Sequence, residues 1–176
     1  MAHGAAMPKG PPIDDTPRLG VVSDTHGRFV ATQRAVSALA QLDVRWVVHC
    51  GDIGSPDIVP LFAHWSTHFV FGNVDTDERA LRRAIDHAGQ TCHERFGELE
   101  LAGRRISFLH GDDTRRLDET AGSGDWDLVC YGHTHVAEMH RQESTLVLNP
   151  GAVHRARRHS VAVVDLREMV ARHIWM

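Results

Sequence analysis

Apolar and polar positions follow two alternating periodicities in the first half of the chain. Short runs rich in valine and other β-formers predict buried strands, and the stretches between them have apolar residues at helical spacing. Pro56 suits the first turn of one helix, and Gly89 suits the end of another. The predicted strands are 18–23, 44–50 and 68–72, and the predicted helices are 29–42, 56–65 and 77–89. This β-α-β-α-β-α order favours parallel strands with right-handed crossovers.

The second half of the chain has a different pattern. Segments 92–101 and 104–111 flank Ala102-Gly103 and predict a β-hairpin. A polar helix is expected near 113–121, followed by a loop. Further short strands are predicted at 127–132, 136–141, 145–151, 160–166 and 169–175. A parallel first half followed by a hairpin-rich second half predicts an α/β fold with two packed mixed β-sheets and helices outside them.

Length and composition bound the class of protein. The chain has 176 residues, of which 42% are hydrophobic and 24% charged, as in ordinary globular domains. We predict a flexible leader over 1–16 and a single domain over 17–176. The sequence shows no signal-peptide pattern and no apolar run long enough to span a bilayer. Its three cysteines have no C-x-x-C spacing, so we expect the reducing cytoplasm as its location. The net charge of -4 argues against bulk binding to nucleic acid or membrane.

Five short patches carry the candidate chemistry, and each places a polar residue beside glycine at the end of a predicted strand. They are SDTHG, HCGDIG, FGNVD, LHGDD and YGHTH, and their candidate metal ligands are Asp24, His26, Asp52, Asn73, His110, His133 and His135. Open α/β sheets expose their sites at such strand ends. In an extended segment, residues i and i+2 project to the same side, so Asp24 and His26 are expected to grip one ion. Each residue alone could instead cap a helix or a turn, but the ordered series favours metal binding.

The ligand types predict two divalent ions and phosphate chemistry. Two such ions carry +4, and the carboxylates Asp24 and Asp52 return only -2, so the centre stays cationic and attracts an anionic phosphate. A hydroxide bridging two metals can attack a phosphoester in line. Mixed imidazole and carboxylate ligands suit manganese, the expected metal, as well as iron, nickel, cobalt or zinc.

In this order the motifs D-x-H, G-D, G-N, H-G and G-H-x-H resemble the calcineurin-like metallophosphoesterase superfamily over residues 18–166. The short chain is most similar to the small prokaryotic phosphodiesterase branch, which is itself similar to the retromer scaffold subunit. The resemblance implies a four-layer αββα sandwich. It also implies that one ion takes Asp24, His26, Asp52 and His135, and that the other takes Asp52, Asn73, His110 and His133. Catalysis through the metals would then involve Asp52, which bridges the ions, together with Asn73 and His133.

Two positions depart from the larger family. Protein Ser/Thr phosphatases carry G-D-x-x-D-R-G and G-N-H-E, whereas GDIGSPD and GNVD put Ser55 and Val74 at the Asp and His of the proton-donating dyad. The leaving-group proton must then come from Asp75, another histidine or water. This favours aryl or nucleotide diesters over alkyl monoesters.

We therefore predict a metal-dependent phosphodiesterase acting on a small, nucleotide-like phosphodiester. The alternatives are a phosphomonoesterase acting on nucleotides or small phosphates and, less favoured, a non-catalytic metal-binding scaffold. A homodimer is a further hypothesis. Beyond the NPGA turn at 149–152, a basic run is interpreted either as a phosphate contact or as solvated surface. Its members are His154, Arg155, Arg157 and Arg158.

Overall fold

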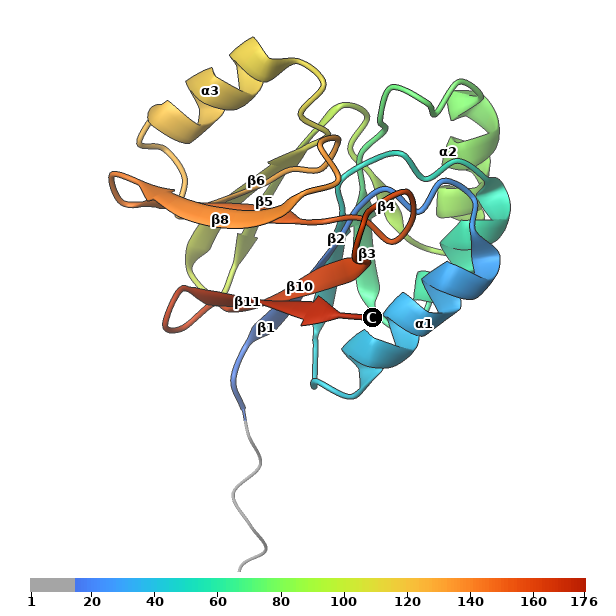
Figure 1. Ribbon diagram of the computed structural model, residues 1–176, viewed down its shortest axis with the longest axis horizontal. Helices are drawn as coiled ribbons and strands as arrows, with labels where there is room; N and C mark the ends of the chain where they lie inside the picture. The colour runs from blue at the N-terminus through green and yellow to red at the C-terminus, as the bar shows by residue number, and fades with distance from the viewer. Residues whose placement is uncertain (1–14) are drawn as a thin grey trace, which may run out of the picture.

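A computed structural model describes residues 15–176, so almost all of the predicted leader lies outside the described part of the chain. The described chain forms two β-sheets packed face to face (Figure 1). The first sheet has the order β11-β10-β1-β2-β3-β4, with β1 Arg18–Val22, β2 Trp46–His49, β3 Ser66–Phe69, β4 Thr91–Cys92, β10 Ser160–Asp165 and β11 Val170–Trp175. The second has the order β5-β6-β7-β9-β8, with β5 Phe96–Leu101, β6 Arg104–Leu109, β7 Leu128–Cys130, β8 Ala137–Gln142 and β9 Thr145–Pro150.

Helices cover both outer faces of this sandwich. The first sheet packs against α1 Phe29–Ala40, the 3-10 helix η1 Pro56–Phe62 and α2 Glu78–His87, and the second sheet lies under α3 Thr114–Gly122. The predicted αββα layering is therefore confirmed.

Three apolar clusters fill the three interfaces between the four layers. Alternation along the strands assigns each side chain to its interface, since successive residues point to opposite faces. In β10, Val161 and Val163 pack toward the helices, whereas Ala162 and Val164 pack between the sheets. Strands buried on both faces explain why these runs are continuously apolar in the sequence.

Strand directions match the prediction in the first half and differ in part in the second. Strands β1, β2 and β3 are parallel, and β5 pairs with β6 as the expected antiparallel hairpin. Its turn residues Ala102 and Gly103 have φ values of 52° and 74°, which suit a two-residue hairpin turn. However, β6, β7 and β9 pair in parallel, because α3 and β8 lie in the connections between them.

Some element boundaries differ from those predicted from the sequence pattern, for local reasons. The helix predicted over 56–65 is a 3-10 helix that ends at Phe62 and contains Pro60, whose missing N–H cannot join an α-helical hydrogen-bond ladder. The segment predicted as one hairpin strand over 92–101 is divided, because Cys92 belongs to β4, which pairs with β3 in the first sheet, and β5 begins only at Phe96. In the described part of the chain, no helix is long and apolar enough to cross a membrane.

Candidate metal centre

All seven candidate ligands meet where strand ends of the two sheets adjoin. Asp24, His26, Asp52 and Asn73 follow β1, β2 and β3 of the first sheet, while His110, His133 and His135 follow β6 and β7 of the second. Backbone hydrogen bonds continue the β1–β2 pairing beyond the strands, from Asp24 N to Gly51 O at 3.1 Å and from His26 N to Asp52 O at 2.9 Å. The loops that carry the ligands are therefore held in register by the sheet.

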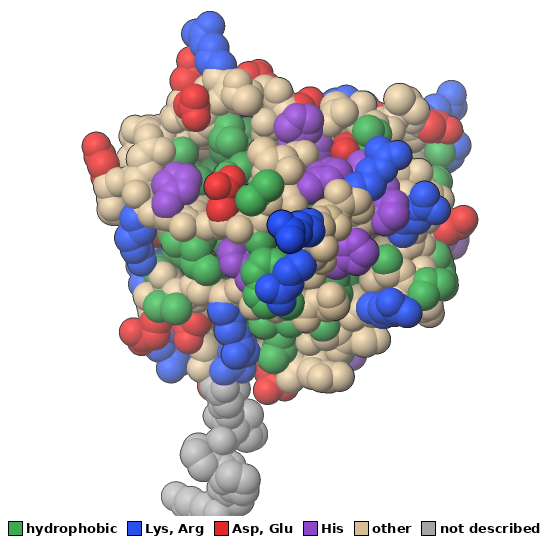
Figure 2. Space-filling model, viewed as in Figure 1, with side chains coloured by type: hydrophobic (Ala, Val, Ile, Leu, Met, Phe, Trp, Pro, Cys, Tyr) green, Lys and Arg blue, Asp and Glu red, His purple; other side chains and the backbone are tan. Residues whose placement is uncertain are grey.

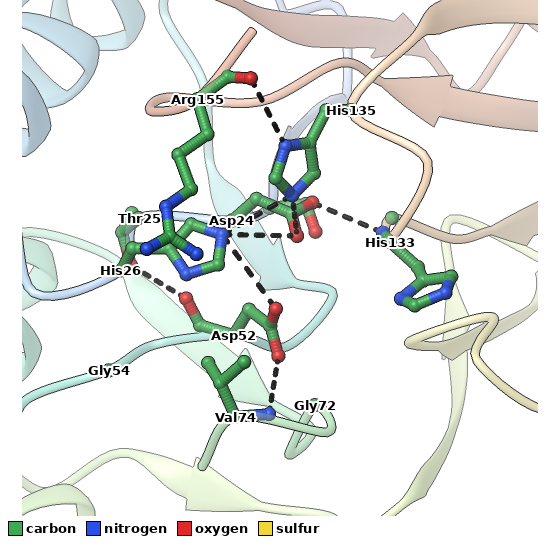
Figure 3. A network of polar contacts seen from close by, with 12 residues as sticks. Asp24, Thr25, His26, Asp52, Gly54, Gly72, Val74, His133, His135 and Arg155 are labelled. Atoms are coloured by element: carbon green, nitrogen blue, oxygen red, sulfur yellow. Dashed lines mark hydrogen bonds and ion pairs between the residues drawn. The ribbon is translucent and has the colours of Figure 1, made fainter.

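The first ligand set comprises Asp24, His26, Asp52 and His135, whose donor atoms all lie within 4.8 Å of one another (Figure 3). His135 Nε2 is 3.1 Å from Asp24 Oδ1, and His26 Nε2 is 3.7 Å from Asp52 Oδ2. Asp24 Oδ1 is buried and accepts no hydrogen bond, so an oxygen with strong acceptor capacity has no protein donor. A cation among these atoms would satisfy it.

The second ligand set comprises Asp52, Asn73, His110 and His133. His110 Nε2 lies 3.3 Å from Asp52 Oδ1 and 3.0 Å from Asn73 Oδ1, and His133 Nδ1 lies 3.1 Å from the same amide oxygen. Asp52 thus turns one carboxylate oxygen toward each set. Asp52 and His110 are buried, whereas Asn73 and His133 are exposed, so the centre has a closed base and an open rim.

Hydrogen bonds at the far side of two imidazoles orient their Nε2 atoms toward the candidate ligand sets. His110 Nδ1 lies 2.8 Å from Cys50 O, and His135 Nδ1 lies 3.4 Å from Arg155 O, so each Nδ1–H donates to a carbonyl. The lone pair of His135 Nε2 then faces His26 Nε2 at 3.3 Å. Imidazoles that donate their far N–H to a carbonyl in this way are typical of metal ligands.

The backbone that carries these ligands is not extended, which corrects the prediction made from the i, i+2 spacing. Asp24, His26, Asp52, His133 and His135 have φ values between 47° and 66°, in the left-handed region that few non-glycine residues adopt. Asp24 and His26 still enter the same set, but His133 and His135 separate into different sets. Such conformations occur where surrounding contacts over-determine them, often at functional sites.

Glycines next to the ligands are required by close approach. A Cβ on Gly132 would lie 2.8 Å from Asp24 Oδ2 and closer still to Ser23 Oγ. A Cβ on Gly51 would lie 2.8 Å from His110 Nδ1. The glycines in the patches therefore have a physical reason, because any side chain there would displace a candidate ligand.

Burial and charge set the protonation of the centre. Burial raises the pKa of the Asp24 carboxyl, and the neighbouring histidines offset this only in part. Burial would also raise the pKa of Asp52, but the hydrogen bond and charge of His110 lower it overall. Burial lowers the pKa of His26, which keeps its ring neutral. An ionised Asp24 is thus costly in this site unless a cation accompanies it.

Residues behind the ligands were not assigned this role from the sequence. The Asp75 carboxylate is buried and accepts hydrogen bonds from the backbone amides of Ile53, Gly54 and Gly72 at 2.8–3.1 Å. It ties the loop after β2 to the loop after β3, and it contacts none of the candidate imidazoles through a hydrogen bond that the described residues show. Its place two residues after Asn73 was the only sequence signal.

A buried histidine supports the loop after β1. The hydroxyl of Thr25 donates to Ile53 O at 3.0 Å and lies 3.1 Å from His49 Nε2. His49 is completely buried, and burial lowers its pKa to about 3, so it is neutral.

The two positions of the absent acid dyad have other contacts. Ser55 caps η1, with its hydroxyl accepting from Asp57 N, and the Val74 side chain is apolar and exposed. Arg155, from the basic run, extends its guanidinium beside His26 (Figure 3), and its charge contributes to the lowered His26 pKa. Neither position supplies an acid, as the sequence predicted, and Arg155 adds a cation beside His26.

Comparisons with known proteins identify the family of this chain. The family model described as the calcineurin-like phosphoesterase superfamily domain matches residues 18–169. The chain is 31% identical over 157 residues to a probable metallophosphoesterase of Methanothermobacter thermautotrophicus, covering 85% of this chain and 84% of the relative. It is 28% identical over 137 residues to phosphodiesterase MJ0936 of Methanocaldococcus jannaschii, covering 76% and 82%. A solved archaeal phosphodiesterase shares the fold with a TM-score of 0.84 at 24% identity, over 90% of this chain and 99% of that one.

The family and the enzyme class predicted from the motifs are thereby confirmed. The chain belongs to the calcineurin-like phosphoesterase superfamily of metal-dependent hydrolases.

Proposed function

We propose that this protein is a phosphodiesterase that works with two divalent metal ions. The first ligand set would hold one ion, the second set the other, and Asp52 would be shared. The observation that carries the proposal is the pair of Asp52 carboxylate oxygens, of which Oδ2 faces His26 at 3.7 Å and Oδ1 faces His110 at 3.3 Å. The unpartnered Asp24 Oδ1 supports the same assignment.

Bound ions would polarise the phosphoryl oxygens and activate a water for in-line attack. The protein's own residues fix where this happens. The exposed Asn73 and His133 leave the rim open to a substrate, and the buried Asp24 and His110 close the opposite side. We assign Asp75 a positioning role in place of proton delivery, because its oxygens are engaged by three backbone amides.

Arg155 supplies the complementary charge for the substrate. Its guanidinium is exposed, lies beside His26 and can donate to a non-bridging phosphate oxygen. This favours the phosphate-contact interpretation of the basic run for Arg155.

The missing acid dyad supports diester over monoester hydrolysis. Ser55 is engaged as a helix cap and Val74 carries no proton, so neither delivers one to an alkoxide leaving group. An aryl or nucleotide diester needs less assistance. The family relative named a phosphodiesterase agrees with this choice.

The test compares two substrates with the same leaving group, bis(p-nitrophenyl) phosphate and p-nitrophenyl phosphate. Each would be assayed with Mn²⁺, the expected metal, and with Fe²⁺, Co²⁺, Ni²⁺ and Zn²⁺. We expect the diester to be preferred, and Asp52→Asn and His133→Ala to lose at least about 10²-fold in kcat/KM. His140→Ala, on the exposed part of β8, is the matched control and should retain full activity.

Elemental analysis completes the test, with two equivalents of metal expected per wild-type chain and fewer in Asp52→Asn. A preference for the monoester would replace the diester assignment with the phosphomonoesterase alternative. Metal binding without turnover of either ester would favour a scaffold. Full activity in Asp52→Asn or in chelated protein would overturn the proposal as a whole.

A further inference from the structure

A cavity of about 530 Å³ adjoins the candidate metal centre on the side of α1. It lies between the start of α1, the loop after β9 and the C-terminal residue Met176. Its volume falls in the range of about 300–1,000 Å³ that is usual for small-molecule sites. The residues that matter for its chemistry are Arg28, Phe29, Val30, Arg34, His154 and His159.

The cavity lies next to the candidate centre, and a row of imidazole rings spans the two. The His154 ring lies 6.2 Å from that of His26 and 6.3 Å from that of His159. Gly27, directly after His26, also lines the cavity. A ligand that places a phosphate at the metal centre can therefore extend into this space without leaving the protein surface.

The charge of the cavity is positive. Among the side chains of the described residues that line it, two are arginines and none is aspartate or glutamate, so the side-chain charge outweighs the single α-carboxylate of Met176. Arg28 Nε donates to His154 Nε2 at 3.2 Å, which holds its guanidinium beside an imidazole that lines the same cavity. Arg34 forms no hydrogen bond or ion pair with any of residues 15–176, so its charge is free to meet a ligand. Figure 2 shows histidine and basic side chains gathered on this face of the molecule.

The same cavity also exposes large apolar side chains to solvent. The side chains of Phe29 and Val30 are 44% and 63% exposed, and Met176 is 40% exposed. An aromatic ring beside two cationic groups matches a ligand that is both flat and anionic. Inorganic phosphate alone would use the arginines and leave this surface uncovered.

We propose that the cavity binds one ester substituent of the substrate, an anionic aromatic group with the chemistry of a nucleotide. The base would lie against Phe29 and Val30, and a phosphate other than the scissile one would pair with Arg28 and Arg34. This inference rests on the proposed phosphodiesterase function and narrows its substrate to nucleotide diesters that carry a second phosphate.

Equilibrium binding to the chelated protein tests the cavity without depending on catalysis. Thymidine 3′,5′-bisphosphate is titrated by calorimetry into wild type, Arg34→Gln and Val30→Asp. We expect Kd to rise at least about fivefold in Arg34→Gln. A larger rise is expected in Val30→Asp, because it places a carboxylate in the cavity. An acid near a helix N-terminus is favourable, so Val30→Asp should fold normally.

Two controls separate the cavity from general effects of charge. Arg83→Gln removes an exposed arginine from α2, outside the cavity, and should leave Kd unchanged. The abasic analogue 1,2-dideoxyribose 3,5-bisphosphate, which keeps both phosphates but lacks the base, should bind at least about fivefold more weakly than the nucleotide. Equal binding of the two ligands, or equal Kd values in wild type and Arg34→Gln, would overturn the proposal.

An activity measurement distinguishes failure of this inference from failure of the proposed function. The 5′-(p-nitrophenyl) ester of thymidine 3′,5′-bisphosphate and bis(p-nitrophenyl) phosphate release the same nitrophenolate. We expect the ratio of their kcat/KM values to fall at least about fivefold in Arg34→Gln. Turnover of both esters with an unchanged ratio would overturn the subsite alone. No turnover of either ester by the metal-loaded wild type would overturn the proposed function itself.

Discussion

Replacing Gly72 with alanine should damage the candidate centre although it replaces none of the candidate ligands. Gly72 precedes Asn73 and packs directly on the Asp52 loop. A Cβ at this position would lie 2.9 Å from Asp52 Cγ and closer still to Asp52 Oδ1 and N, whereas carbon atoms pack best at about 3.5–4.0 Å. The φ angle of Gly72 is not in the left-handed region, so the effect is steric and does not come from backbone strain.

The magnitude follows from the displacement that relieves this overlap. The closest overlap is with Asp52 Oδ1, so Asp52 or the Gly72 backbone must move by about 1 Å to restore ordinary contact. Functional groups must be held within about 0.5 Å of their working geometry, and a misplacement of 1 Å costs roughly 10²-fold in rate. We therefore expect Gly72→Ala to lower kcat/KM for bis(p-nitrophenyl) phosphate by about that factor. Overpacking should also lower the free energy of unfolding by about 1–3 kcal/mol.

Gly122→Ala is the matched control, since it makes the same chemical change at the exposed end of α3. Its Cβ would meet only the flexible end of Gln142 at 3.0 Å, and alanine favours a helix over glycine by roughly 0.5–1 kcal/mol. Steady-state kinetics, metal content and urea denaturation of both variants give the comparison. Wild-type metal content and activity in a folded Gly72→Ala protein would refute the packing argument for the centre.

Three further substitutions test the charges around the centre. Asp24→Asn should stabilise the chelated protein at neutral pH, because burial raises the Asp24 pKa and makes its ionised form costly. The same variant should lose metal binding. Relative to wild type, its melting temperature should therefore be higher without metal and lower with metal. His49 has a pKa of about 3 in the folded protein and 6.5 when unfolded, so its contribution is present above pH 6.5 and is lost as the pH falls toward 3, by about 2 kcal/mol at pH 5. Urea midpoints of wild type and His49→Gln between pH 7 and 5 check this, and parallel curves would contradict it. Asp75→Asn should lower the free energy of unfolding by about 1.5–3 kcal/mol, because an amide cannot accept from all three backbone donors. An unchanged urea midpoint would contradict the role of Asp75 in tying the two loops together.

Much of the fold and the candidate site could be predicted because their signals are local. Asp24 and Asp52 each follow an apolar strand and lie within three residues of a glycine. Both features can be recognised from a few consecutive residues. The continuous apolar run along β10 likewise indicates a strand buried on both faces.

What could not be predicted depends on contacts between distant segments. The left-handed backbone at Asp24 is set in part by its hydrogen bond to Gly51 O, from a loop 27 residues away. The Asp75 carboxylate accepts from the backbone amides of Ile53 and Gly54. Every residue except proline has such an amide, so the residue types do not reveal this contact. The parallel pairing of β6 with β7 was also missed, since an alternating pattern does not encode strand direction.

The division of the ligands between the two sheets has a mechanical consequence. Asp24 and Asp52 belong to one sheet, and His110 and His135 belong to the other, so the geometry of the centre registers how far apart the sheets stand. A change in the apolar layer between them, at Leu148 for example, alters that spacing and is transmitted to the ligands as a rigid-body shift. Ions bound by ligands of both sheets would link the two sheets at one edge of the sandwich. The stability of their packing would then depend on whether metal is bound.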